Sequence, residues 1–352
     1  MKAMDGHVHR PFDAQCRNQT TPLCARERLR LLDGQLLRYS APICAALPNS
    51  NFALAYAGLA DSYNLLDDWG KTPPRDSFPK ARFAAERAIA LDDSLAEAHV
   101  SLAMVRAAYD WDWTDAEQEF RRAIELNPNY ATAHQWYGLL LASLGRFPEA
   151  EIEVRRAQQL ELLSPIINMA VAEVFTWERR YDDAIAEYKK ILELDPSFDG
   201  AYGNLGEVYA AKGMCAESLA RWKEKCALTG EMDFARDLEK SYARSGYPGL
   251  LRAELNFDLA TRASGEYSNP VGIAEVYAAL GDTPHALEWL QKAYEEHSSG
   301  MQFLNADAKF DSIRSNPKFQ YWLNTVNLPS QTSHPSSTLS VSSPLHNSSA
   351  GH

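Results

Sequence analysis

Few residues in this sequence combine the types and the spacing that chemistry requires. Residues 70–72 (Gly-Lys-Thr) have the ending of a phosphate-binding loop, in which backbone amides and a lysine hold a nucleotide. That loop also needs an earlier glycine, where this chain has Leu65, and a following helix, where it has Pro73 and Pro74. We therefore expect no nucleotide site at this position.

Side chains that could bind a metal gather only near the start of the chain. His7 and His9 lie beside Asp5, and Cys16 and Cys24 follow. A structural metal site needs about four preorganised donors, and this segment has no pattern of elements to hold them. Elsewhere no nucleophile, acid–base pair or metal set converges. We therefore expect a protein that is not an enzyme and that needs no cofactor and no metal.

The elements that would position any site follow a fixed period. A small residue returns about every 34 positions through most of the chain, and a period of this length is typical of stacked helical hairpins. Each hairpin buries its apolar face against its neighbours, which gives a continuous core. The residues that mark the period are Ala81, Ala116, Ala150, Ala184, Ser218, Leu251 and Ala286.

One period, residues 131–165, shows what each unit contains. Two stripes at helical spacing are separated by Gly145 and Pro148, which predict a tight turn. The first stripe is His134, Tyr137, Gly138 and Leu141, and the second is Ala150, Val154, Ala157 and Leu160. Gly138 and Ala150 would lie where the two helices cross, and their small side chains would let the helix axes approach closely.

This pattern resembles the tetratricopeptide repeat, whose consensus is W-x2-L-G-x2-Y followed by A-x3-F, A and P. Residues 109–113 (YDWDW), 278–282 (AALGD) and 309–311 (KFD) further resemble one bacterial subfamily. The resemblance covers about residues 51–329, with a degenerate sixth unit around residues 238–259. It implies an all-α, right-handed superhelical solenoid of about six to seven helix-turn-helix units, closed by a C-terminal capping helix over about residues 310–328.

The organisation of the chain follows from this assignment. Residues 1–48 match nothing in the family and are expected to form a poorly ordered or irregular leader, or one degenerate helix, and this leader is either genuine or the product of a misread start. Residues 49–328 form the solenoid, in which an insertion at 66–79 lengthens the first turn. The serine-rich tail, residues 329–352, has too few large apolar side chains to fold and is expected to be disordered.

Charge and composition limit the partners. The net charge is −12, while the leader carries an excess of basic residues and the tail carries no charge, so the repeats are strongly acidic. Such a body argues against direct binding to nucleic acid and favours basic partners. No apolar run is long enough to span a bilayer, and no signal-peptide core is present. Five dispersed cysteines fit the reducing cytoplasm.

The resemblance implies that four positions of each first helix face a concave groove. On this chain they are mostly aliphatic or acidic, and they lack the basic set that clamps a terminal carboxylate in co-chaperone members of the superfamily. We expect the groove to bind a protein or peptide segment with apolar anchors and some basic residues. The candidate groove residues are Asp61, Met104, Gln135, Leu139, Ile166, Met169, Glu173, Glu207 and Glu275.

A second candidate surface is aromatic. Tyr109, Trp111 and Trp113 lie at the bend between two helices. They could form an exposed ledge that binds a partner, because aromatic anchors dominate interface energies, or they could form a buried hydrophobic plug. His99 and His134 occupy the place where the repeat pattern puts an aromatic, so we interpret them as packing residues.

Two functions remain open at this stage. The first is a non-catalytic scaffold for protein–protein interaction, which binds a partner segment in its concave groove. The second is the sensory or assembly half of a bacterial transcriptional regulator or signalling kinase whose effector domain is absent from this chain. In the resembling subfamily the repeat array usually follows a winged-helix domain, a nucleotide cyclase or a serine/threonine kinase.

Overall fold

The computed structural model describes residues 53–68 and 72–329, and every regular element in these ranges is a helix. The predictions for the leader, for the candidate metal ligands near the start, for residues 70 and 71, and for residues 330–352 of the tail lie outside the described residues. The predicted all-α fold is confirmed for the part of the chain that the structure describes.

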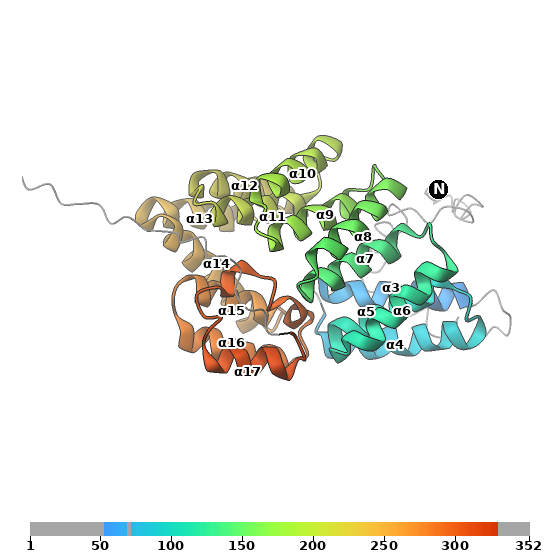
Figure 1. Ribbon diagram of the computed structural model, residues 1–352. Helices are drawn as coiled ribbons and strands as arrows, with labels where there is room; N and C mark the ends of the chain where they lie inside the picture. The colour runs from blue at the N-terminus through green and yellow to red at the C-terminus, as the bar shows by residue number, and fades with distance from the viewer. Residues whose placement is uncertain (1–52, 69–71, 330–352) are drawn as a thin grey trace, which may run out of the picture.

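The helices form antiparallel hairpins in sequence order (Figure 1). Each helix packs on its hairpin partner, and successive hairpins pack on one another. The pairs are α3 (Ala53–Asp68) with α4 (Pro74–Leu91), α5 (Ala96–Val105) with α6 (Trp113–Leu126), α7 (Ala131–Ser143) with α8 (Phe147–Leu160), α9 (Pro165–Trp177) with α10 (Tyr181–Leu194), α11 (Asp199–Ala211) with α12 (Cys215–Thr229), α13 (Met232–Ser245) with α14 (Tyr247–Ala263), and α15 (Pro270–Ala279) with α16 (Thr283–Glu295). The predicted solenoid of stacked hairpins is therefore confirmed.

Small residues set the distance between the helices of a hairpin. All seven residues that mark the period are at most 4% exposed. A Cβ atom added to Gly138 would lie 2.5 Å from Cγ1 of Val154 and 3.1 Å from the carbonyl oxygen of Ala150. Because no side chain fits in that space, the crossing of α7 and α8 depends on the glycine.

The same side-chain hydrogen bond to the preceding loop recurs at one position of three first helices. Ring nitrogens of His99 and His134 lie 3.0 and 3.1 Å from the carbonyl oxygen six residues earlier, and Asn168 donates to the equivalent carbonyl over 3.0 Å. The other ring nitrogen of each histidine lies 2.6 Å from a carboxylate on the second helix, Glu119 or Glu153. These histidines thus join each hairpin to the loop that precedes it, which is more than the packing role expected from the sequence.

Two segment boundaries differ from those expected. The irregular insertion was predicted over residues 66–79, but α3 continues to Asp68 and α4 begins at Pro74, so most of that segment is helical. Proline is compatible with the first turn of a helix, where its missing N–H has no intrahelical partner in any case. The prolines therefore mark the start of α4 instead of extending the turn.

The end of the chain is also less regular than predicted. The sequence suggested one capping helix over residues 310–328, whereas the helix α17 covers only Pro317–Thr325. It follows two short 3-10 turns, η4 (Ser299–Phe303) and η5 (Ala308–Phe310). Asn316 caps α17 through its side chain, which accepts a hydrogen bond from the backbone N–H of Lys318. We call residues 297–329 the closing segment.

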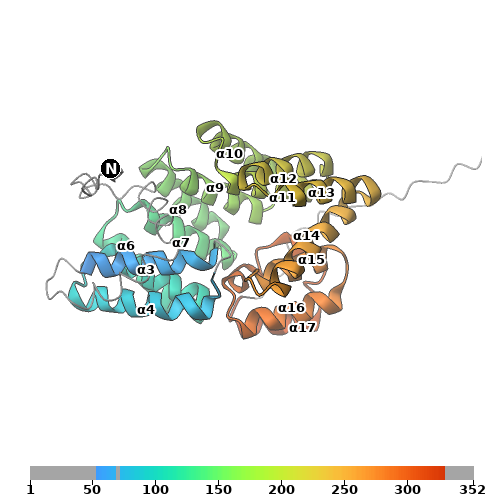
Figure 2. The same ribbon diagram turned by 180° about the vertical axis from the view of Figure 1, so that it is seen from behind.

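The sixth hairpin changes the direction of the stack. It has a separate small core that includes Phe234, Leu238 and Leu250, and its turn is Gly246, with φ +65° and ψ −147°. From there α14 leads back, and α15–α17 lie next to α3–α6 in both views (Figures 1 and 2). The indole N–H of Trp113 donates to the carbonyl oxygen of Val326 over 2.9 Å. The end of the solenoid therefore packs against its beginning.

Candidate functional site

The first helices of successive hairpins lie side by side and form the face on which the nine candidate groove residues were placed. Helix α7 contacts both α5 and α9, as expected for that face. The structure divides the nine residues into two groups. Met104, Gln135 and Leu139 are buried, with exposed fractions of 5–6%. The other six are partly exposed: Asp61, Ile166, Met169, Glu173, Glu207 and Glu275.

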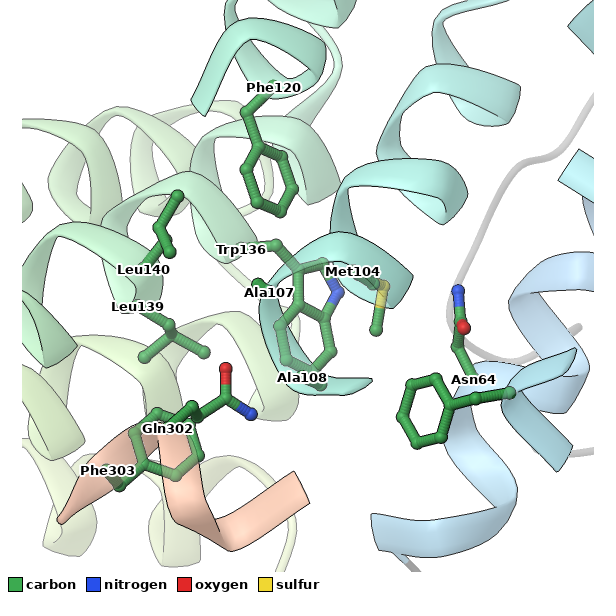
Figure 3. A pocket seen from close by; sticks show the side chains of 11 residues that line it. Asn64, Met104, Ala107, Ala108, Phe120, Trp136, Leu139, Leu140, Gln302 and Phe303 are labelled. Atoms are coloured by element: carbon green, nitrogen blue, oxygen red, sulfur yellow. The ribbon is translucent and has the colours of Figure 1, made fainter. Parts of the chain in front are cut away.

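The closing segment lies next to two of the three buried residues, Met104 and Leu139. Gln302 and Phe303 of η4 line a small cavity of about 20 Å³ together with Met104 and Leu139 (Figure 3). The ring of Phe303 also stacks on Trp177 at the end of α9, with 4.8 Å between the ring centroids. An apolar anchor thus already occupies the part of the groove in which the sequence predicted partner anchors.

A lysine of the closing segment meets two of the predicted acids. Nζ of Lys309 lies 3.2 Å from a carboxylate oxygen of Glu207 and 3.0 Å from one of Glu275. These residues come from α11 and α15, which the turn at the sixth hairpin brings to the same side chain. The acidic positions of the groove therefore bind a cation, and here the cation belongs to the same chain.

The surroundings of this lysine carry an excess of acids. Burial alone would lower the pKa of Lys309, but the negative charges of Glu207, Glu275 and other neighbours raise it well above its usual value. Burial raises the pKa of Glu275 to about 8, although Lys309 opposes that shift. Burial, with a contribution from Glu207, also raises the pKa of Glu254 on α14 to about 7. One lysine does not neutralise this group of carboxylates.

An arginine holds the closing segment on the other side. Arg179 follows α9 and has φ +66°, a left-handed conformation that favours glycine. Its guanidinium donates to the carbonyl oxygen of Ala306 over 2.7 Å and to the carboxylate of Asp311 over 3.0 Å. Arg179 therefore ties the turn between α9 and α10 to the closing segment.

Of the two alternatives for the aromatic residues, the exposed ledge is wrong for the two tryptophans, which are buried as in the hydrophobic plug. Trp111 and Trp113 are buried, with 6% and 8% exposed, and Tyr109 is partly exposed. The rings of Tyr109 and Trp111 stack on His297, at 4.7 and 5.2 Å between centroids, and Trp111 also stacks on Tyr294. The two tryptophans do not form an exposed surface, because Tyr294 of α16 and residues of the closing segment pack against them.

Sequence reasoning missed the partners supplied by the closing segment. In the sequence, Lys309 stands out only as part of the bacterial subfamily pattern, and no pattern marks Phe303. Arg179 did carry a signal: it stands one period after Gly145 and one period before Gly213, both of which have positive φ. A charged residue at a position where neighbouring repeats use glycine could have marked the contact.

Other chemistry has few candidates within residues 53–68 and 72–329. No group of three or more His, Cys, Asp or Glu side chains there could hold a metal ion. Both cysteines in these ranges, Cys215 and Cys226, are free thiols, and burial raises the pKa of each. In the same ranges, no helix has both the length and the apolar character needed to cross a bilayer.

Two family models match the hairpins described above. One, described as a tetratricopeptide repeat, matches residues 102–161, and the other, described as a TPR repeat, matches residues 179–213. The first spans most of α5 through α8, and the second spans α10 and α11.

Comparison with characterised proteins gives partial likenesses. The protein O-mannosyl-transferase Tmtc1 of Drosophila melanogaster is 36% identical over 75 residues, which are 21% of this chain and 9% of that protein. The structure of PilW, a type IV pilus biogenesis factor, is 18% identical with a TM-score of 0.47 and covers 64% of this chain and 97% of PilW. The structure of PilF from Pseudomonas aeruginosa is 15% identical with a TM-score of 0.40 and covers 71% of this chain and 96% of PilF.

Proposed function

Since this chain is a tetratricopeptide repeat protein, we propose that it is a non-catalytic scaffold that binds a segment of a partner protein on its concave face. The observation that carries this proposal is the position of Lys309 between Glu207 and Glu275. It indicates that the acidic face accepts a basic side chain that arrives next to apolar residues. The partner segment would combine apolar anchors with lysine or arginine.

The partly exposed residues supply the proposed contacts. Ile166 and Met169 on α9 offer apolar surface, and Glu173 lies on the same helix. Glu207, on the adjacent helix α11, keeps 41% of its side chain exposed even while it pairs with Lys309. Methionine adapts its shape easily, which suits a surface that must accept segments of varied sequence. We expect no direct contact with nucleic acid, because the proposed face is acidic.

The test is selection of peptides from a random library by the full-length protein. We expect enrichment of sequences with apolar and basic residues, and about tenfold weaker binding of the selected peptides to Glu173→Lys or Glu207→Lys variants, because the attraction becomes a repulsion. Glu193→Lys is the matched control, since Glu193 is exposed on the second helix α10. Enrichment of acidic C-termini, or equal loss in the control, would contradict the proposal.

A second proposal is that these repeats form the sensory or assembly part of a regulator. It is supported by the resemblance of residues 109–113, 278–282 and 309–311 to a subfamily in which the array follows an effector domain. The DNA upstream of the coding region, read in all frames, distinguishes the two proposals. A winged helix, cyclase or kinase encoded there would favour a regulator acting in the cytoplasm, and its absence would leave the scaffold alone.

A further inference from the structure

Some helix ends of this protein have a non-glycine residue in the left-handed conformation, and most of these residues contact or belong to the closing segment. Among the described residues, six glycines have positive φ, as do four residues that carry side chains. Glycine adopts this conformation without strain, whereas a residue with a Cβ does not. Three of the four side chains, those of Trp111, Arg179 and His297, take part in the contact between the closing segment and the rest of the solenoid. The backbone strain is thus concentrated at that contact.

Arg179 gives the clearest case. Gly145 and Gly213 form the same turn one period before and one period after it, with φ +77° and +76°. Arg179 adopts φ +66°, and its guanidinium makes the two contacts with Ala306 and Asp311. A strained residue persists only where its surroundings hold it, and such residues are common at clamps and switches. Here the strain accompanies a side chain that fastens the closing segment.

The stacked rings of Trp111 and His297 form a second contact that holds the closing segment, and here too the backbone is strained. Residues Arg106–Asp110 form a short π-helix, a feature that is common at functional sites, and Trp111 ends it at φ +54°. Trp111 stacks on His297, which also has φ +54°. The buried indole Nε1 of Trp111 has no hydrogen-bond acceptor within the part of the chain that the structure describes. A buried donor without an acceptor is destabilising, so this ring contact carries an energetic cost even though the closing segment buries Phe310, Phe319 and Leu323 in the main core.

The fit over the groove is also incomplete. The cavity between Gln302, Phe303 and the first helices is lined by Asn64, which is 1% exposed (Figure 3). Its Nδ2 donates to the carbonyl oxygen of Ser101 over 2.9 Å, but its Oδ1 has no donor among the residues of known position. A buried amide oxygen without a donor is unfavourable, so the polar groups around this cavity are not fully satisfied. The closing segment thus covers the groove without matching it fully.

We propose that the closing segment is an internal occupant of the concave face, and that a partner segment with an aromatic residue and a lysine six positions later competes for the place of Phe303 and Lys309. This inference rests on the proposed function and names both the partner chemistry and the regulation. Phe303 supplies an aromatic anchor at the cavity that Met104 and Leu139 also line, and Lys309 supplies the cation for Glu207 and Glu275. The contacts of Arg179 and Trp111 hold the segment in place, and the backbone strain at these residues lowers the cost of its release to such a partner.

The first experiment measures release of the closing segment in the full-length protein. The variant Arg179→Gly removes the two guanidinium contacts with the closing segment, and its turn is expected to keep its shape because the equivalent positions are Gly145 and Gly213. Hydrogen exchange should become at least about tenfold faster across residues 299–329 and stay unchanged in α7 and α8. Arg146→Ala is the control, since Arg146 pairs with Glu117 and Glu149 instead of the closing segment.

The second experiment measures competition. A labelled synthetic peptide of residues 299–312 should bind Arg179→Gly at least about tenfold more tightly than it binds the unaltered protein, because the site is partly vacated. The same peptide with Lys309→Glu should not bind either protein.

Equal exchange in Arg179→Gly and the unaltered protein, or no difference in peptide affinity, would overturn this inference. The scaffold proposal is tested separately, because library peptides that bind around Glu173 would support it even if the closing segment never leaves.

Discussion

The hairpins α7–α8 and α13–α14 both contain a glycine at which the two helices approach closely, but they differ in where that glycine lies and in how the stack continues. In the first, the close approach is between Gly138 and Ala150, which are well separated from the turn. In the second, it is between Gly249 and Ser241, close to the turn, where an added Cβ would lie 2.0 Å from the Ser241 carbonyl oxygen. The first hairpin continues the stack, whereas the second redirects it. A solenoid therefore changes course where its repeat loses regular spacing.

The redirection determines which groove residues are accessible. A straight continuation would leave the face of α5 and α7 open along its length. Instead the sixth hairpin brings the closing segment back, and Phe303 and Lys309 occupy positions that the repeat pattern assigns to a partner. The difference between the two hairpins thus decides the exposure of residues more than 100 positions earlier in the chain.

The largest expected effect is on the regular hairpin. Replacing Ala150 by Trp should lower the free energy of unfolding by about 3 kcal/mol, because the crossing with Gly138 has no space for a larger side chain. Urea unfolding followed by circular dichroism measures this. Lys189→Trp on the exposed side of α10 is the control and should change stability by less than about 0.5 kcal/mol. Equal losses in the two variants would contradict the assigned register.

The next effect concerns the turn of the degenerate hairpin. Gly246→Ala should cost about 2 kcal/mol, because φ +65° with ψ −147° lies in a region that is essentially restricted to glycine. Gly145→Ala in the regular α7–α8 turn should cost about 1 kcal/mol, because alanine can adopt a left-handed conformation at lower cost. Thermal unfolding of both variants gives the comparison. Equal costs for the two alanines would contradict the assignment of Gly246 to a conformation that requires glycine.

The third prediction uses pH to separate the regions. Glu254 has a pKa raised from 4.5 to about 7, so the folded protein keeps a proton that the unfolded chain loses. The free energy of unfolding should therefore fall as pH rises from 4.5 through 7.

Glu254→Gln should remove this part of the pH dependence and raise stability at pH 8 by about 1–2 kcal/mol, with no gain at pH 4. Unfolding with urea at both pH values measures the change. A variant that is less stable than the original at pH 8 would show that the charged form of Glu254 is stabilising.

The smallest expected effect is in the second hairpin. A hydrogen bond that the His99 ring donates to the carboxylate of Glu119 raises the pKa of His99 above 6.5, although burial opposes it. Its stabilising contribution is therefore complete below about pH 6.5 and is lost as pH rises through the higher folded pKa. Replacing His99 by Asn, which holds the same place at Asn168, should reduce the slope of stability against pH in this range. An unchanged slope would place the titration elsewhere.

The repeat itself was predictable because it depends on local spacing. Ala150 and Gly138 recur with the period of a hairpin, and each position contacts residues at most one unit away. Those short-range contacts are what periodicity reports, so the stack of hairpins and the small residues at their crossings were predicted. The bounds of the insertion and of the last helix were not. The acidic character of the groove was likewise visible, since Glu207 and Glu275 occupy its positions in the pattern.

The sequence alone therefore determined that this chain is a stack of helical hairpins with an acidic inner face. Only the tertiary structure decided that Met104 and Leu139 are buried, that Trp111 and Trp113 are buried, and that Lys309 lies between Glu207 and Glu275 in the groove. These outcomes depend on contacts such as that between Trp113 and Val326, which are 213 residues apart. Such a contact depends on the packing angles between successive hairpins, added along the stack, and on one irregular turn. A local sequence pattern contains no information on that total.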